Sequence, residues 1–131
     1  MAGHATVGDD AFLSGYVVVH QFARIGRLAM VSGASTVRQD IIPFCVADGH
    51  PARPKGLNVV GIRRAGMSAE QLRDLKRAYR VLFGHEGTLD RRLTELGEDS
   101  REGVPEVSEL VEFVRASDRG IARPRRRPRL S

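Results

Sequence analysis

Large aliphatic residues recur at every sixth position through the first 42 residues of the chain. They are Met1, Val7, Leu13, Val19, Ile25, Val31 and Val37. A second series, four positions further along, is Ala or Ser in five of its seven members: Ala5, Ala11, Val17, Ala23, Ala29, Ser35 and Ile41. An amphipathic helix repeats its apolar positions about every 3.6 residues and a half-buried strand about every 2, so neither explains a period of six.

Short repeats of fixed length are typical of solenoids, and hexapeptide repeats of parallel β-helices. Each hexad can supply one strand and one corner, so three hexads close a triangular coil of 18 residues. The aliphatic side chain fills the prism, the small residue fits where the interior is narrow, and coils stack at about 4.8 Å. We therefore predict a parallel β-helix over residues 1–42; the alternative is a run of ordinary short strands.

The pattern changes after residue 42. Residues 43–61 contain three Pro and three Gly, so we expect a basic connecting loop over 43–66. Residues 67–121 predict a small helical domain. Ser68 is the expected N-cap of its first helix, with Gln71 at the capping-box position and Gly84 at the end. Further helices are expected over 89–96 and 105–116.

The net charge of +5 is unevenly distributed. Residues 1–42 are neutral, residues 43–66 carry +3, residues 67–118 carry −4 and residues 119–131 carry +6. We expect the Arg-rich tail, 122–131, to be disordered. Such a tail can touch nucleic acid or anionic lipid, but no aromatic residue accompanies it, so we treat it as an appendage and do not expect nucleic acid as the partner.

We expect no internal disulfide, signal peptide or transmembrane segment in these residues. The single cysteine, Cys45, cannot form an internal disulfide, which is compatible with a reducing compartment. The first ten residues lack the basic and apolar regions of a signal peptide, and no apolar run is long enough to be a transmembrane segment. We predict neither a cofactor nor a metal site.

Five stretches carry a more specific resemblance: "AGH" at 2–4, "VVHQFARIG" at 18–26, "QDIIPF" at 39–44, "GLNVVGIRRAG" at 56–66 and "SDRGI" at 117–121. Together they resemble the second half of the UDP-N-acetylglucosamine 3-O-acyltransferases, from residue 1 to about residue 121. The resemblance implies a left-handed β-helix followed by a helical domain, a cytoplasmic location, and a homotrimer with sites in the clefts between neighbouring prisms.

The chemistry that the resemblance implies is the first step of lipid A biosynthesis. A 3-hydroxyacyl chain moves from acyl carrier protein to the 3-hydroxyl of UDP-N-acetylglucosamine. A histidine takes the proton of that hydroxyl, which is a poor nucleophile while protonated, and a backbone N–H stabilises the oxyanion.

Catalytic and donor-side residues follow from the motif positions. Gly3 matches the oxyanion donor and His4 an assisting histidine, while His20 and Gln21 match acyl-donor contacts. His4 and His20 lie 16 positions apart, two short of one coil, which predicts a separation of roughly 8 Å if one face carries both. Taken alone, Gly3 could equally be a corner glycine and His4 an ordinary solvent-facing residue.

The remaining matches concern the acyl groove and the nucleotide sugar. Met30 and Gly33 match positions that limit acyl length, and Gly33 leaves the groove open, so we expect a long acyl chain. Asn58, Arg63 and Arg64 match nucleotide-sugar contacts, and guanidinium groups suit a diphosphate because they bind phosphate oxygens in a bidentate way. Without the resemblance, Gly33 would be another corner and the arginine pair a solvated loop charge.

Several departures bear on activity. The family's His-x-x-His-Asp segment, which holds the general base, lies about one coil upstream of His4, and Met1 already occupies an interior hexad position. Asp48, Pro51 and Val60 replace a Gln, a His and an acidic residue of the family pattern. We therefore expect a fragment or half enzyme that is inactive alone. The alternatives are a non-catalytic trimeric module or degraded relative, and a protein that acts through its Arg tail.

Overall fold

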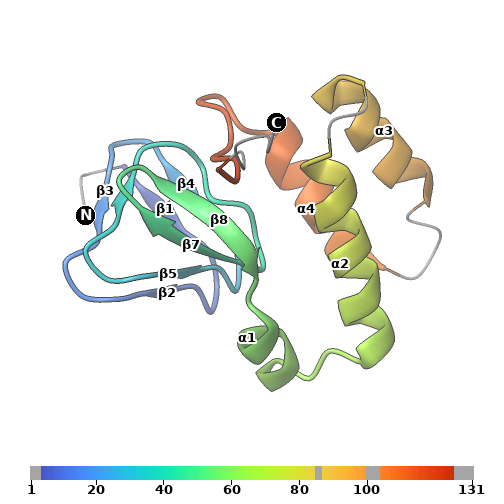
Figure 1. Cartoon of the computed structure of the whole chain (residues 1–131), viewed down its shortest axis with the longest axis horizontal. Coiled ribbons are helices and arrows are strands. Elements are labelled where there is room, and N and C mark those ends of the chain that lie inside the picture. The colour runs from blue at the N-terminus through green and yellow to red at the C-terminus, as the bar shows by residue number, and fades with distance from the viewer. Residues whose placement is uncertain (1–3, 85–86, 100–103, 126–131) are drawn as a thin grey trace, which may run out of the picture.

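The computed structural model of the chain describes residues 4–84, 87–99 and 104–125. It consists of a stack of short strands beside three longer helices (Figure 1). Gly3 and residues 126–131, the greater part of the Arg-rich tail, lie outside the described residues.

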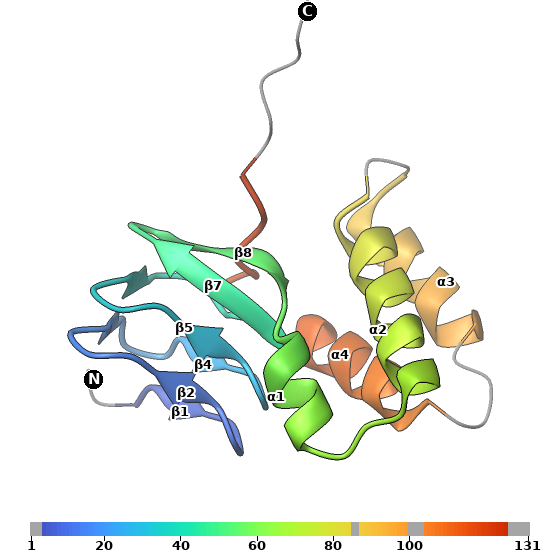
Figure 2. The ribbon, with the colours of Figure 1, turned by 60° about the horizontal axis from the view of Figure 1, so that its bottom comes forward.

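The hexapeptide repeats form two-residue strands that begin at every sixth residue, from Thr6 to Thr36. The six strands are β1 (Thr6–Val7), β2 (Phe12–Leu13), β3 (Val18–Val19), β4 (Arg24–Ile25), β5 (Met30–Val31) and β6 (Thr36–Val37). Strands one coil apart pair in parallel, β1 with β4, β2 with β5 and β3 with β6, so that Val7 lies opposite Ile25. The predicted β-helix and its 18-residue coil are confirmed. Figure 2 shows the coils as successive layers.

The corners are made by one backbone conformation that recurs every six residues. Left-handed φ angles between 57° and 67° occur at His4, Asp10, Tyr16, Phe22, Leu28 and Ala34. None of these is glycine, although the left-handed conformation costs an L-residue roughly 1–2 kcal/mol. The corner residues are exposed, Tyr16 to 95%, with the exception of Leu28, which is 5% exposed.

The interior of the β-helix is formed by the two series that the sequence predicts. Ile25, Val31 and Val37 are fully buried or nearly so, and Ala23 and Ala29 fill the narrow positions beside them. They belong to one buried cluster that also includes Ile41, Ile42, Phe44 and Cys45 and the buried residues of the helices.

The prediction of a loop over residues 43–66 is wrong. The segment forms β7 (Cys45–Gly49), β8 (Ala52–Leu57) and the short helix α1 (Val59–Arg64). β7 continues the β2–β5 sheet in parallel and β8 pairs with it antiparallel. Pro54 is tolerated because β8 is an edge strand, where one side of the backbone needs no ladder hydrogen bond.

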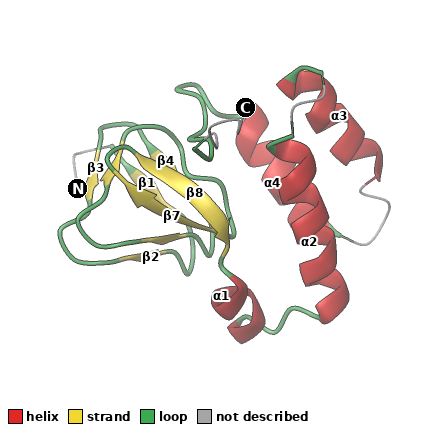
Figure 3. Ribbon diagram, in the orientation of Figure 1, coloured by secondary structure: helices red, strands yellow, loops and turns green. Residues whose placement is uncertain are grey.

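The helical domain is as expected in its number and type of elements. It contains α2 (Ala69–Leu82), α3 (Leu89–Asp99) and α4 (Pro105–Arg115), which pack against one another (Figure 3). The capping box is present: the Ser68 hydroxyl accepts from the Gln71 N–H at 3.1 Å, and the Gln71 side chain accepts from the Ser68 N–H at 2.7 Å. The α2 C-cap is Phe83, one residue before Gly84. No helix in the described ranges is long and apolar enough to cross a membrane.

Candidate functional site

One corner, formed by the stacked first and second coils, gathers most of the donor-side residues named from the sequence. The ring of His4 stacks on the ring of Phe22, with centroids 5.3 Å apart and planes 15° from parallel. Phe22 follows His4 by one full coil, so the stack is a direct product of the 18-residue period. His20 and Gln21 immediately precede Phe22, and all four residues are exposed.

The segment that follows α4 returns to this corner. Its Arg119 guanidinium donates a hydrogen bond to the backbone carbonyl of Gln21. The segment is attached through Asp40, which is 1% exposed. The Asp40 carboxylate accepts from the Arg24 N–H at 2.8 Å and from the Ser117 hydroxyl at 2.6 Å, so both of its oxygens have a partner.

The two expected acyl-groove residues lie on the outer face of the β2–β5 sheet and at its end. Met30 lies directly opposite Phe12, a residue that is 59% exposed. A Cβ added to Gly33 would come no closer than 3.5 Å to the carbonyl oxygen of Gly15, an ordinary contact. The space beside Gly33 is therefore open, and a side chain there would extend over the surface.

Asn58 is the N-cap of α1, a role that the sequence analysis did not assign to it. Its side-chain oxygen accepts from the Gly61 N–H at 3.1 Å, and its amide nitrogen donates to the Leu28 carbonyl at 2.9 Å. This pair of bonds fixes the start of α1 on the β-helix. Arg63 and Arg64 are exposed in the last turn of α1, where the helix dipole favours positive charge.

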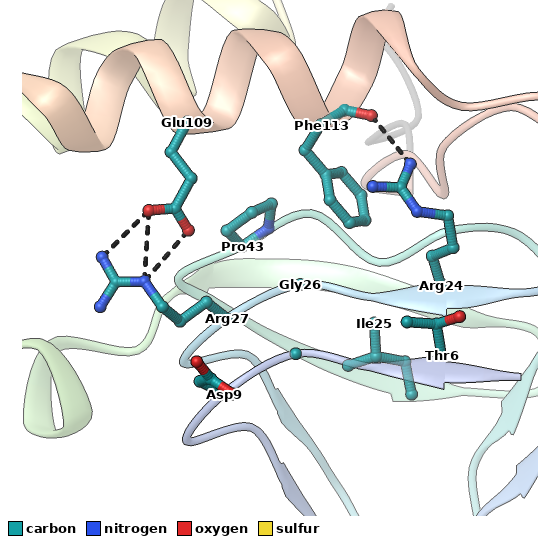
Figure 4. A pocket seen from close by; sticks show the side chains of 10 residues that line it. Thr6, Asp9, Arg24, Ile25, Gly26, Arg27, Pro43, Glu109 and Phe113 are labelled. Carbon is teal, nitrogen blue, oxygen red and sulfur yellow. Dashed lines mark hydrogen bonds and ion pairs between the residues drawn. The ribbon is translucent and has the colours of Figure 1, made fainter.

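An open cleft of about 320 Å³ lies at a different place, along the seam between the β-helix and α4 (Figure 4). Arg27 on one side binds Glu109 on the other through its Nε and Nη2 at 3.1–3.2 Å. The bond to Glu109 raises the pKa of Arg27 above its ordinary value, although partial burial opposes it. Arg24 lies over the Phe113 ring at 4.1 Å and donates to the Phe113 carbonyl.

The cleft is lined by Thr6, Gly8, Asp9, Arg24, Ile25, Gly26, Arg27, Pro43, Glu109 and Phe113. This set includes none of the described site residues that the sequence analysis named. Because Arg24 and Arg27 are engaged with α4, we interpret the cleft as the junction between the two parts of the fold. Among the described residues, no cluster of three or more His, Cys, Asp or Glu side chains could hold a metal ion.

Sequence reasoning missed Asp40 and Arg119. Both lie in stretches that carry the family resemblance, "QDIIPF" and "SDRGI". Their place in these stretches is the only feature of the sequence that could have pointed to them. No local pattern pairs residues 77 or 98 positions apart, the separations of the Asp40–Ser117 and Gln21–Arg119 contacts.

A parallel β-helix of hexapeptide repeats followed by a helical domain defines a hexapeptide-repeat protein. Residues 40–122 match the family model described as UDP-N-acetylglucosamine O-acyltransferase, domain 2. The chain therefore belongs to the UDP-N-acetylglucosamine O-acyltransferase family, whose chemistry is part of lipid A biosynthesis.

Individual relatives have the same name as this family. The chain is 46% identical over 123 residues to the acyl-[acyl-carrier-protein]–UDP-N-acetylglucosamine O-acyltransferase of Alkalilimnicola ehrlichii, covering 94% of this chain and 47% of that protein. It is 48% identical over 126 residues to the protein of the same name from Burkholderia orbicola, covering 94% and 48%. The chain thus spans about half the length of the curated relatives it matches.

Solved structures give the same result. The UDP-N-acetylglucosamine O-acyltransferase of Moraxella catarrhalis superposes with a TM-score of 0.86 at 36% identity, covering 92% of this chain and 47% of that one. The Arabidopsis UDP-N-acetylglucosamine acyltransferase gives 0.85 at 37% identity, covering 93% and 46%.

Proposed function

We propose that this chain supplies the second half of an enzyme that transfers a 3-hydroxyacyl chain from acyl carrier protein to the 3-hydroxyl of UDP-N-acetylglucosamine. The observation that carries the proposal is the corner at which His4 stacks on Phe22 beside His20 and Gln21. An acyl transfer needs a group that takes up a proton, contacts to the acyl donor, and access for both substrates. At this corner the side chains of His4, His20 and Gln21 are exposed to solvent.

The roles proposed for the individual residues are those of the family. The Gly3 N–H stabilises the oxyanion that forms when the sugar hydroxyl attacks the thioester carbonyl. His4 assists, and His20 and Gln21 contact the acyl donor. Arg63 and Arg64 bind the diphosphate of the nucleotide sugar, and Asn58 takes part by holding α1, which carries both arginines.

The general base is proposed to come from hexads that precede His4, in the coil beneath the first strands. On this proposal residues 1–131 need the other half of the enzyme for activity, since they span about half the length of the curated relatives. The working assembly is proposed to be a homotrimer, with the corner facing a cleft between neighbouring prisms.

The test is an acyl-transfer assay with 3-hydroxyacyl-acyl carrier protein and UDP-N-acetylglucosamine. The purified chain is assayed alone and after co-expression with the N-terminal half of the Burkholderia orbicola relative. We expect product only in the second case, and none with His20→Ala. His50→Ala is the matched control, because His50 is also an exposed histidine but belongs to the β7–β8 hairpin, where its Nδ1 bonds to the Thr36 hydroxyl. Absence of product under both conditions would end the enzyme proposal.

The acyl groove is tested in the same assay. Gly33→Met adds a long side chain to an open position, so the preferred acyl chain should become shorter. Gly15→Ala is the comparison, because a Cβ at Gly15 would have no atom within 4 Å. An unchanged chain-length preference in Gly33→Met would remove Gly33 from the groove.

A further inference from the structure

The segment that leaves α4 is anchored on the β-helix on both sides of Arg119. Before it, the Ser117 hydroxyl donates to the Asp40 carboxylate. After it, the Gly120 carbonyl accepts from the Asp40 N–H at 3.1 Å, and the Ala122 N–H donates to the Asp40 carbonyl at 2.8 Å. One buried residue therefore fixes the backbone that carries the Arg119 side chain.

Arg119 extends from this anchored segment to the corner of the second coil, where its guanidinium donates to the Gln21 carbonyl. That carbonyl belongs to the peptide between Gln21 and Phe22, and Phe22 is a corner residue with φ of 67°. A carbonyl that is held from outside fixes the orientation of this peptide. The backbone from which the His20 and Gln21 side chains project is fixed with it.

Arg119 and the residue that anchors its segment, Asp40, differ in burial and therefore in what they can contribute. Asp40 is buried, whereas Arg119 and Gln21 are exposed. Exposed side chains contribute little to global stability, so the contact is poorly placed to hold the fold together. It is well placed to hold a turn whose own side chains bind a ligand.

We propose that Arg119 is a positioning residue for the acyl-donor contacts His20 and Gln21, and that the helical domain acts on the donor side of the site through it. The inference rests on the proposed function, since it takes the donor as the ligand of this corner. Arg119 acts through the Gln21 backbone and does not touch the reacting atoms.

The test compares Arg119→Gln, Arg119→Lys and Arg123→Gln with the unaltered chain, each co-expressed with the N-terminal half used above. Arg123 is a matched control, because it is exposed in the same segment and bonds through its backbone carbonyl, to Arg53. Titrations measure Kd for 3-hydroxyacyl-phosphopantetheine and, separately, for UDP-N-acetylglucosamine. The amide shift of Phe22 in an isotope-labelled sample reports the contact itself.

We expect Arg119→Gln to weaken donor binding about five- to tenfold, the effect of losing one hydrogen bond of ordinary net strength at an exposed site. Binding of UDP-N-acetylglucosamine and the melting temperature should stay unchanged. Arg119→Lys should recover most of the affinity, because an ammonium can donate to the same carbonyl, and Arg123→Gln should match the unaltered chain. The Phe22 amide should shift in Arg119→Gln alone.

Two results overturn the inference while leaving the proposed function intact. One is an unchanged donor Kd in Arg119→Gln; the other is an equal loss for both ligands, which indicates a general disturbance of the fold. If the unaltered assembly binds neither ligand, the proposed function fails and the inference fails with it.

Discussion

The hydroxyl of Ser117 donates a hydrogen bond of 2.6 Å to a carboxylate oxygen of Asp40, and so joins two residues 77 positions apart. The other Asp40 oxygen accepts from the Arg24 N–H, in the coil below. A single buried carboxylate thus connects two coils of the β-helix with the segment that follows the helical domain. Removing the carboxylate should weaken the attachment of this segment to both coils.

The first prediction concerns this carboxylate. Asp40→Ala removes both carboxylate oxygens, which leaves the Arg24 N–H and the Ser117 hydroxyl without this acceptor. We expect the free energy of unfolding, measured by urea denaturation, to fall by about 2 kcal/mol, and by about 1 kcal/mol in Ser117→Ala. Asp118→Asn, on the exposed residue beside Ser117, should stay within about 0.5 kcal/mol of the unaltered chain. Equal effects at Asp40 and Asp118 would contradict the buried role of Asp40.

A second prediction compares two glycines of the repeats. A Cβ on Gly26 would lie 2.4 Å from the backbone nitrogen of Pro43, whereas a Cβ on Gly33 would lie 3.5 Å from its nearest neighbour. We expect Gly26→Ala to destabilise the fold by about 3 kcal/mol or more, because backbone atoms must move. Gly33→Ala should be close to neutral. Thermal unfolding followed by circular dichroism measures both, and a tolerated Gly26→Ala would show that the coils can separate locally at little cost.

A third prediction separates the two bonds of Asn58. Asp is as good an N-cap as Asn, so Asn58→Asp retains the bond from the Gly61 N–H and loses only the donor to the Leu28 carbonyl. Asn58→Ala loses both. We expect the Ala variant to cost about 1 kcal/mol more than the Asp variant in urea denaturation. If the two variants cost the same, the cap bond contributes nothing, and α1 is held by the bond to the Leu28 carbonyl and by packing.

The fourth prediction concerns alkaline pH. Burial raises the pKa of Cys45 from 9.0 to about 12. Burial, with a smaller contribution from the charge of Cys45, raises the pKa of Tyr79 from 10.0 to about 12. Both groups hold their protons more tightly in the folded chain, so their stabilisation is complete below about pH 9 and is lost as the pH rises towards 12.

The free energy of unfolding should therefore decline between pH 9 and 11. Cys45→Ala and Tyr79→Phe remove one titrating group each, and each should flatten the decline by up to about 1.4 kcal/mol per pH unit. Slopes are compared and not absolute stabilities, because Cys45→Ala also leaves a small cavity. An unchanged slope in both variants would assign the alkaline loss to other groups.

The sequence predicts the β-helix well because its signal is periodic and local. Val19, Ile25 and Val31 recur at the interval at which the backbone turns, and each is buried in the prism. The capping box of α2 is predicted for the same reason, since Ser68 and Gln71 lie three residues apart and satisfy each other's backbone.

The hairpin and the junction could not be predicted in this way. Pro51 and Pro54 suggest a loop, yet the neighbouring strand β5 offers β7 a ladder that sequence alone does not reveal. Asp40 gives no sign of burial in its own neighbourhood, because its partners lie in the preceding coil and after α4. The site divides along the same line: the His4–Phe22 stack follows from the repeat, whereas the Arg119 contact depends on how the helical domain folds back.

The corners at His4, Asp10, Tyr16, Phe22, Leu28 and Ala34 restrict how this molecule can change in length. Inserting or deleting one residue in a hexad would displace every later bend and turn aliphatic side chains out into water. A whole circuit of three bends can be gained or lost without that penalty. Diversification of the stack should therefore proceed by complete turns, while short insertions accumulate in the hairpin and between the helices.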